Sequence, residues 1–221
     1  GVGRDANGNV LPNARFPDMK ALCDYIHSRG LKAGIYSSPG IYTCQGYTGS
    51  FQHEQLDAQR YAEWGFDYLK YDWCYTTHII PNVSLHEQRI PWLTMARALA
   101  GTKRDLVFSL SETLEVWPWA KEAGANCWRT TGDITDTWAS VDDIGFTQNG
   151  LEKVAGPGHW NDCDMFVVGM LGGGRLHPTR LTADQVFDAI DWVLGDIDDG
   201  RPNLPIRPGA PGSRRSPRAE F

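Results

Sequence analysis

Short runs of apolar and β-branched residues alternate along the chain with longer stretches whose apolar residues recur at helical spacing. These runs predict strands at Leu31–Ser38, Asp67–Asp72, Asp105–Ser111, Asn126–Thr130 and Gly158–Asp162. The longer stretches predict helices at Pro17–Arg29, His53–Trp64, Glu87–Ala100, Trp117–Ala123 and Thr182 to about Leu194. Strands that alternate with helices in this way are typical of a parallel sheet built from βα units. We therefore expect an α/β fold.

The rhythm of these units matches a (β/α)8 TIM barrel, although the chain is too short to close one. About five to six βα units fit into it, against the eight of a complete barrel. We therefore expect an incomplete barrel, comprising its middle and later part. We treat residues 1–195 as this partial domain. Residues 196–221 are rich in Pro, Arg and Gly without an apolar period, which predicts a disordered or frame-shifted tail.

Composition narrows the range of partners. The chain has 221 residues, of which 41% are apolar, so it is long enough for one sizeable core. A net charge of -6 and a pI near 5.5 provide no basic surface, so we expect neither nucleic acid nor an anionic membrane as a partner. The five cysteines lack the spacing of a structural zinc site.

Candidate chemistry begins at the end of the second predicted strand. Because side chains alternate across a strand, Lys70 and Asp72 face one side. Active sites of βα barrels lie at the carboxyl ends of the strands. A neighbouring lysine favours the ionised carboxylate that a nucleophile needs. The alternative is a structural Asp that caps the following turn and pairs with Lys70, and this motif alone does not decide between the two.

A second carboxylate follows the fourth predicted strand, where Arg129 precedes Asp133 by four residues. Two carboxylates on separate strand ends are what cleavage of a glycosidic bond requires. Taken singly, an ion pair on the surface or a cap of the following turn explains these residues better than catalysis does. The segment His159–Met165 adds two more carboxylates and an aromatic residue, without the regular spacing of an EF-hand calcium site.

Together these segments resemble glycoside hydrolase family 27, the melibiase-type alpha-galactosidases. The resemblance extends over about Arg4 to Leu181, in four ordered blocks: GLKAGIYSSPGIYTCQGY (Gly30–Tyr47), LKYDWC (Leu69–Cys74), WRTTGDI (Trp128–Ile134) and GHWNDCDMFVVG (Gly158–Gly169). It implies a catalytic (β/α)8 barrel whose first two strands and last strand are missing from this chain.

The resemblance also implies a retaining glycosidase that acts on terminal α-D-galactosyl residues and uses neither a metal nor another cofactor. Asp72 falls on the family's nucleophile and Asp133 on its general acid/base. The positions that hold the sugar hydroxyls fall on Tyr36, Lys70, Glu112, Arg129 and Asp164.

A disulfide of the family falls on Cys44 and Cys74. Because disulfides persist in oxidising compartments, this pairing predicts a secreted, periplasmic or lysosome-like location. For Cys44 the alternative is a small buried apolar residue.

The chain departs from the family pattern at two places. The segment around Glu112 reads Ser-Glu-Thr instead of Cys, an acid or amide, and an aromatic residue, and Cys163 replaces an expected Pro. Other activities of the family therefore stay open: alpha-N-acetylgalactosaminidase, beta-L-arabinopyranosidase and isomalto-dextranase. A catalytically inactive barrel piece is a further alternative. A phosphate-binding metabolic barrel has only Leu171–Arg175 (LGGGR) as a candidate phosphate loop.

Overall fold

The computed structural model describes residues 3–76, 85–112, 115–135 and 137–164. They belong to two compact units, which are described separately. The first unit runs over Gly1–Ile134 and Gly150–Met165, and the second contains Thr135–Asn149. The sheet and all predicted site residues lie in the first unit.

The first unit is built on a parallel sheet of five strands. They are β1 (Gly34–Ser37), β2 (Tyr68–Asp72), β3 (Val107–Ser111), β4 (Cys127–Arg129) and β5 (Trp160–Asp162). Their order in the sheet is β1-β2-β3-β4-β5, so each strand pairs with its neighbour in the sequence. The five predicted strands and their parallel arrangement are therefore confirmed.

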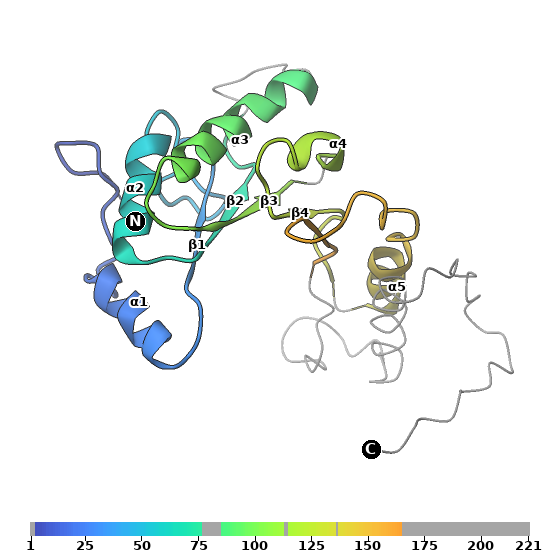
Figure 1. Ribbon diagram of the computed structural model, residues 1–221, viewed down its shortest axis with the longest axis horizontal. Coiled ribbons are helices and arrows are strands. Elements are labelled where there is room, and N and C mark those ends of the chain that lie inside the picture. The colour runs from blue at the N-terminus through green and yellow to red at the C-terminus, as the bar shows by residue number, and fades with distance from the viewer. Residues whose placement is uncertain (1–2, 77–84, 113–114, 136, 165–221) are drawn as a thin grey trace, which may run out of the picture. The chain divides into compact units, whose positions relative to one another are not determined.

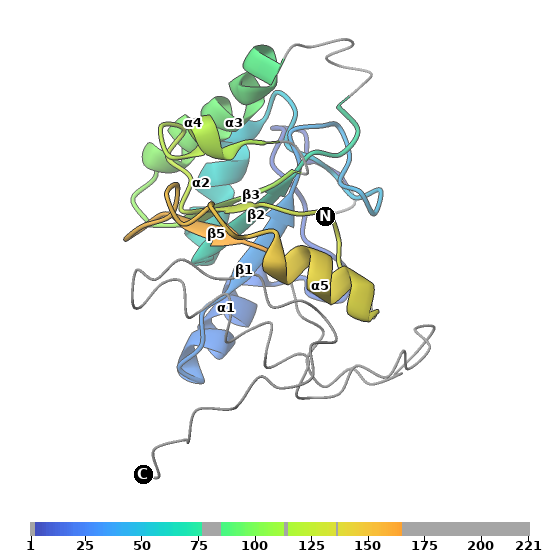
Figure 2. The same cartoon turned by 90° about the vertical axis from the view of Figure 1, so that its right-hand side faces the viewer.

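Of the helices described in this unit, the first precedes β1 and the others connect successive strands, as the apolar pattern predicts. They are α1 (Met19–Ser28), α2 (Glu54–Trp64), α3 (Leu85–Ala100) and α4 (Trp117–Ala120). The Asp18 carboxylate caps α1 by accepting a hydrogen bond from the Ala21 amide, and α2 ends at Gly65, whose φ of 93° places it in the left-handed region that favours glycine. Figures 1 and 2 show α2 and α3 side by side along the sheet, and α4 lies on the same face.

Aromatic packing fixes the face of the sheet that the helices cover. The ring of Tyr71 in β2 lies 5.5 Å from that of Trp92 in α3 and 5.9 Å from that of Phe108 in β3. Leu69, two residues before Tyr71, is also fully buried. Because alternate residues of a strand point to opposite faces, Lys70 and Asp72 face away from these helices.

Asp67 organises the amino end of the sheet, just before β2 begins. Its carboxylate accepts hydrogen bonds from the amide of Ala33 at 2.8 Å, from His27 at 2.7 Å and from the guanidinium of Arg104 at 2.6 Å. Burial alone would raise the pKa of Asp67, but these bonds lower it to about 2. The carboxylate therefore joins α1, the start of β1 and the segment before β3.

One helix was not predicted from the sequence. In the second unit, α5 (Trp138–Phe146) is capped by Thr137, whose hydroxyl accepts a hydrogen bond from the Ser140 amide. The helix predicted at Thr182 to about Leu194 and the tail at 196–221 lie outside the described residues. Among the helices that the structure does describe, none is long and apolar enough to cross a membrane.

We predict that Asp67→Asn lowers the free energy of unfolding by on the order of 2 kcal/mol at neutral pH, because it removes the charge that pairs with Arg104. The native pKa of Asp67 lies below its ordinary value of 3.8. Its contribution to stability is therefore complete above about pH 4 and is lost as the pH falls toward 2. Denaturant unfolding from pH 7 to pH 2 measures both effects.

The control is Asp24→Asn, which removes an exposed carboxylate paired with Lys20 on α1. It should leave stability nearly unchanged at every pH. Equal losses in the two variants would contradict the role given to Asp67.

Candidate active site

The predicted site residues gather at the carboxyl ends of the strands. Tyr36 is the penultimate residue of β1, and Asp72 and Arg129 are the last residues of β2 and β4. Loops after the strands contribute the others: Glu112 follows β3 directly, Asp133 lies four residues beyond β4, and Asp164 lies two residues beyond β5. Since the strands are parallel, all of these positions lie at one edge of the sheet.

A short hydrogen bond orients Asp72. The hydroxyl of Tyr36 donates to the Oδ2 atom of Asp72 at 2.6 Å. Tyr36 pairs with Lys70 in the sheet register, so its side chain lies on the same face as those of Lys70 and Asp72. Burial and this hydrogen bond raise the pKa of Tyr36, so the phenol stays protonated and keeps donating. From the sequence, Tyr36 was expected only to bind the sugar, and this contact with Asp72 was missed.

The predicted disulfide between Cys44 and Cys74 is present, with Cα atoms 5.1 Å apart. It joins the loop after β1 to the segment directly after Asp72. Both sulfur atoms and a carboxylate oxygen of Asp72 lie within 4.8 Å of one another. In the described part of the chain, no other three His, Cys, Asp or Glu side chains gather closely enough to hold a metal ion. Because these sulfurs are bonded to each other, the group offers no thiolate.

Arg129 connects the loops after β4 and β5. Its side chain is only 4% exposed, and it forms ion pairs with Asp133 at 3.1 Å and with Asp164 at 3.4 Å. It also donates to the carbonyls of Thr131 at 3.0 Å and Gly132 at 2.6 Å. The described residues offer no hydrogen-bond partner to its buried Nε atom. Arg129 thus fixes the loop that carries Asp133.

Asp164 holds this loop from the other side. Its Oδ2 atom accepts a hydrogen bond from the Ile134 amide at 2.9 Å, and its own amide donates to Asp162 at 2.9 Å. The backbone of Asp164 has a φ of 73°, a left-handed conformation that Asp tolerates better than most residues. Strain of this kind is common in active-site loops.

A cavity of about 270 Å³ brings the two candidate catalytic carboxylates together. It is lined by Cys44, Asp72, Trp73, Ser111, Glu112, Arg129 and Asp133. Glu112 is buried, whereas the Asp133 side chain is 91% exposed and stands at the open side. Neither Trp73 nor Ser111 was predicted from the sequence. Ser111 could have been found from the sequence. The predicted second and third strands end at Asp72 and Ser111, and these two residues pair in the sheet.

Lys70 lies next to this group but outside the cavity lining. It shares a strand face with Asp72 and pairs with Tyr36 and Ser109 in neighbouring strands. Within the described residues it makes no ion pair with Asp72, whose described partner is the Tyr36 hydroxyl. Direct pairing of Lys70 with Asp72, the structural alternative for that motif, is therefore not observed.

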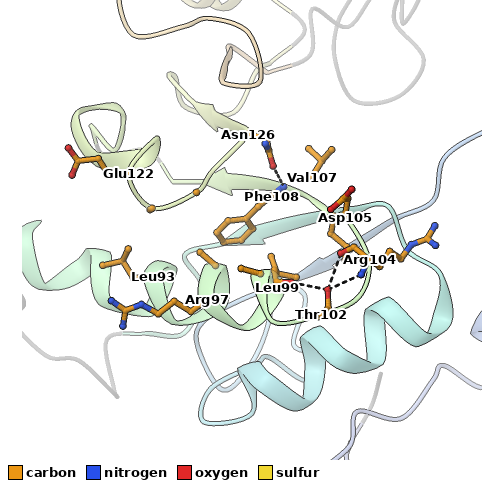
Figure 3. Close-up of a pocket in the computed structure, with 15 residues that line it drawn as sticks. Leu93, Arg97, Leu99, Thr102, Arg104, Asp105, Val107, Phe108, Glu122 and Asn126 are labelled. Atoms are coloured by element: carbon orange, nitrogen blue, oxygen red, sulfur yellow. Dashed lines mark hydrogen bonds between the residues drawn. The ribbon is translucent and has the colours of Figure 1, made fainter.

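A larger cavity of about 620 Å³ lies elsewhere, between α3, β3 and the segment after α4. Figure 3 shows Phe108 reaching from β3 toward α3, with Arg104 and Asp105 at the start of the strand. None of the predicted site residues lines it. Asp105 precedes β3, so this cavity extends to the amino end of the sheet, opposite to Asp72.

Comparison with known proteins places this geometry in a family. The family model described as alpha galactosidase A matches residues 2–183. An alpha-galactosidase A from Cellvibrio japonicus is 44% identical over 181 residues, covering 75% of this chain and 43% of that protein. An alpha-N-acetylgalactosaminidase from chicken is 43% identical over 189 residues, covering 76% of this chain and 44% of that protein.

A solved structure is similar in fold as well. The alpha-galactosidase of Saccharomyces cerevisiae with raffinose superposes with a TM-score of 0.71 at 31% identity, over 79% of this chain and 43% of that chain. The chain therefore spans about two fifths of the length of these relatives. Its five-stranded sheet corresponds to part of their (β/α)8 barrel. From the family match and these identities, the chain belongs to the alpha-galactosidase A, or melibiase, family of glycoside hydrolases.

Proposed function

We propose that the protein carrying this chain is a retaining glycoside hydrolase that releases terminal α-D-galactosyl residues from oligosaccharides or glycoconjugates. The observation that carries this proposal is the single cavity that both Asp72 and Asp133 line. Glycosidases use two carboxyl groups that lie on either side of the bond to be cleaved, and two such groups line this cavity. Membership of the alpha-galactosidase family supports the choice of sugar.

In the proposed mechanism, Asp72 is the nucleophile. Its carboxylate attacks the anomeric carbon while Asp133 donates a proton to the departing glycosidic oxygen, giving a covalent galactosyl-enzyme and a free alcohol. Water then attacks the same carbon, Asp133 takes up a proton from it, and Asp72 leaves. Two inversions at one carbon restore the starting configuration. The cycle uses side chains and water, and requires neither a metal ion nor another cofactor.

The contacts around the two acids support these roles. The Tyr36 hydroxyl, 2.6 Å from Oδ2 of Asp72, leaves the other carboxylate oxygen available for attack. Asp133 is held from one side by Arg129 and is otherwise exposed, so both the leaving group and the attacking water can reach it. We infer that Arg129, Asp164, Lys70 and Tyr36 also contact the sugar hydroxyls.

Glu112 favours galactose over its 2-acetamido analogue. The side chain is buried and lines the cavity. A carboxylate there can accept a hydrogen bond from a sugar hydroxyl, whereas an acetamido group is bulkier and needs small neighbours. We therefore place alpha-N-acetylgalactosaminidase activity second.

The disulfide bears on where the protein works. A cystine that bridges the loop beside the active site survives in an oxidising compartment. We accordingly propose a secreted, periplasmic or lysosome-like location, with a carbohydrate as the partner.

The carboxylate roles predict opposite azide products from 4-nitrophenyl α-galactoside. Asp72→Gly should abolish hydrolysis, and added azide should then attack the sugar directly to give β-galactosyl azide. Asp133→Gly should slow hydrolysis of natural galactosides by about 10²- to 10⁴-fold. Azide should intercept its covalent intermediate and give α-galactosyl azide. Proton NMR of the products measures the configuration, and the protein is expressed together with any sequence that flanks this chain in its gene.

Asp105→Asn is the control, because Asp105 precedes β3 at the opposite end of the sheet; it should retain activity. If Asp72→Gly gave the α-azide and Asp133→Gly the β-azide, the roles of the two carboxylates would be the reverse of those proposed. Inverted galactose from the unaltered protein would disprove the retaining mechanism.

The contact between Tyr36 and Asp72 predicts a selective loss of turnover. Tyr36→Phe removes a hydrogen bond to a charged group, and kcat should fall by about 10- to 100-fold. The control, Tyr68→Phe, removes a hydroxyl of the same sheet that contacts the Cys127 thiol at 3.6 Å, and it should change kcat little. Steady-state kinetics on 4-nitrophenyl α-galactoside compares the two variants. A kcat of Tyr36→Phe equal to that of the control would show that the phenol does not assist Asp72.

A further inference from the structure

The loop after β1 forms a small hairpin beside the cavity. Residues 41–49, named here the rim hairpin, contain an antiparallel bridge between Tyr42 and Thr48. The Thr43 amide donates to the Tyr47 carbonyl at 2.7 Å, and the Gly49 amide donates to the Ile41 carbonyl at 2.9 Å. The hairpin is therefore an ordered element that presents fixed side chains.

Close backbone contacts hold the rim hairpin against the end of β2. The hydroxyl of Ser38 donates to the Cys74 carbonyl at 2.8 Å. Gly40 packs so tightly there that a Cβ atom would collide with the same carbonyl. On the far side, Arg4 donates to the Gly49 carbonyl at 2.6 Å and pairs with the buried Asp57. With the disulfide, these contacts fix the hairpin relative to Asp72.

Two tyrosines stand where the rim hairpin meets the segment after β2. Tyr42 precedes Cys44 by two residues and Tyr75 follows Cys74, and their rings make an edge-to-face contact with centroids 5.7 Å apart. They are 47% and 48% exposed, respectively. Tyr75 has a left-handed φ of 50°, a conformation that costs free energy for a bulky residue. Tyr75 therefore keeps an unfavourable backbone conformation although its ring is about half exposed.

The disulfide links the two segments that carry the tyrosines directly to the cavity. Cys44 lines the cavity, and both sulfur atoms lie within 4.8 Å of a carboxylate oxygen of Asp72. Among the described residues, the well-exposed aromatic side chains outside the rim hairpin and Tyr75 are Phe16, Tyr25 and Trp160. Tyr25 lies on α1, and Trp160 begins β5 at the amino end of the sheet.

We propose that Tyr42 and Tyr75 form the subsite for the leaving group, where they contact the apolar face of the sugar to which the galactosyl residue is attached. This inference rests on the proposed function. The cavity of about 270 Å³ suits a single sugar ring. Asp133 protonates the glycosidic oxygen from the open side, where its side chain is 91% exposed. The leaving sugar therefore lies outside the cavity on its rim, and tyrosine rings offer apolar area together with a polar hydroxyl.

The test compares two substrates that share the galactosyl group. Melibiose has a glucose leaving group that reaches the rim, whereas the leaving group of α-galactosyl fluoride is one atom that cannot. Tyr42→Ser and Tyr75→Asn should each lower kcat/KM for melibiose by about ten-fold and leave kcat/KM for the fluoride unchanged. Asn is chosen because it tolerates the backbone conformation at position 75. The protein is used with any flanking sequence that its gene encodes.

Tyr25→Ser, which removes an exposed ring from α1, is the matched control and should change neither rate. Equal losses on both substrates would overturn the inference, since the rings would then only support the disulfide and Asp72. Unchanged rates on both substrates would overturn it as well. If the unaltered protein fails to hydrolyse the fluoride, the proposed function itself is wrong. That result differs from a failure of the subsite alone, in which the unaltered protein is active.

Discussion

The parallel pairing of β2 with β1 and β3 is the constraint on which the site depends. It sets Tyr36 beside Lys70 and Asp72 beside Ser111, at one edge of the sheet. Tyr71, on the opposite face of β2, packs against the rings of α3 and β3. A register slip of one residue would exchange the two faces and bury Asp72 among aromatic rings. Core packing therefore specifies the direction in which Asp72, the proposed nucleophile, points.

The two carboxylates differ in the group that holds each of them. A neutral phenol, Tyr36, holds Asp72 with one strong hydrogen bond, whereas a cation, Arg129, holds the loop that carries Asp133. Arg129 is a buried charge, and leaving it without a partner would be costly. The loop is therefore held in the conformation that brings Asp133 and the carbonyls of Thr131 and Gly132 to Arg129. Asp72 is half-buried beside the disulfide and the Asp133 side chain is 91% exposed, an asymmetry that suits a nucleophile and a general acid/base.

The sequence predicted the strands well because their apolar runs and their order along the chain are local properties. Family motifs predicted the disulfide, which is present, and the same motifs supply the candidate catalytic and sugar-binding positions. The sequence missed the hydrogen bond from Tyr36 to Asp72, the lining residues Trp73 and Ser111, and the tyrosine pair at the rim, since these depend on distances between segments far apart in the chain. It also missed α5, whose main signal is the single cap at Thr137. Contacts across the sheet require the register, which periodicity alone does not specify.

The covalent intermediate on Asp72 is the central claim, and trapping it is the most direct test. The protein is incubated with a fluorinated α-galactosyl fluoride that forms the glycosyl-enzyme quickly and releases it slowly, and is then digested and sequenced by mass spectrometry. We predict one added fluorosugar on the peptide that contains Leu69–Cys74, attached to Asp72. A sugar attached to any other residue would contradict this mechanism, as would complete hydrolysis of ordinary α-galactosides with inverted configuration and no labelled peptide.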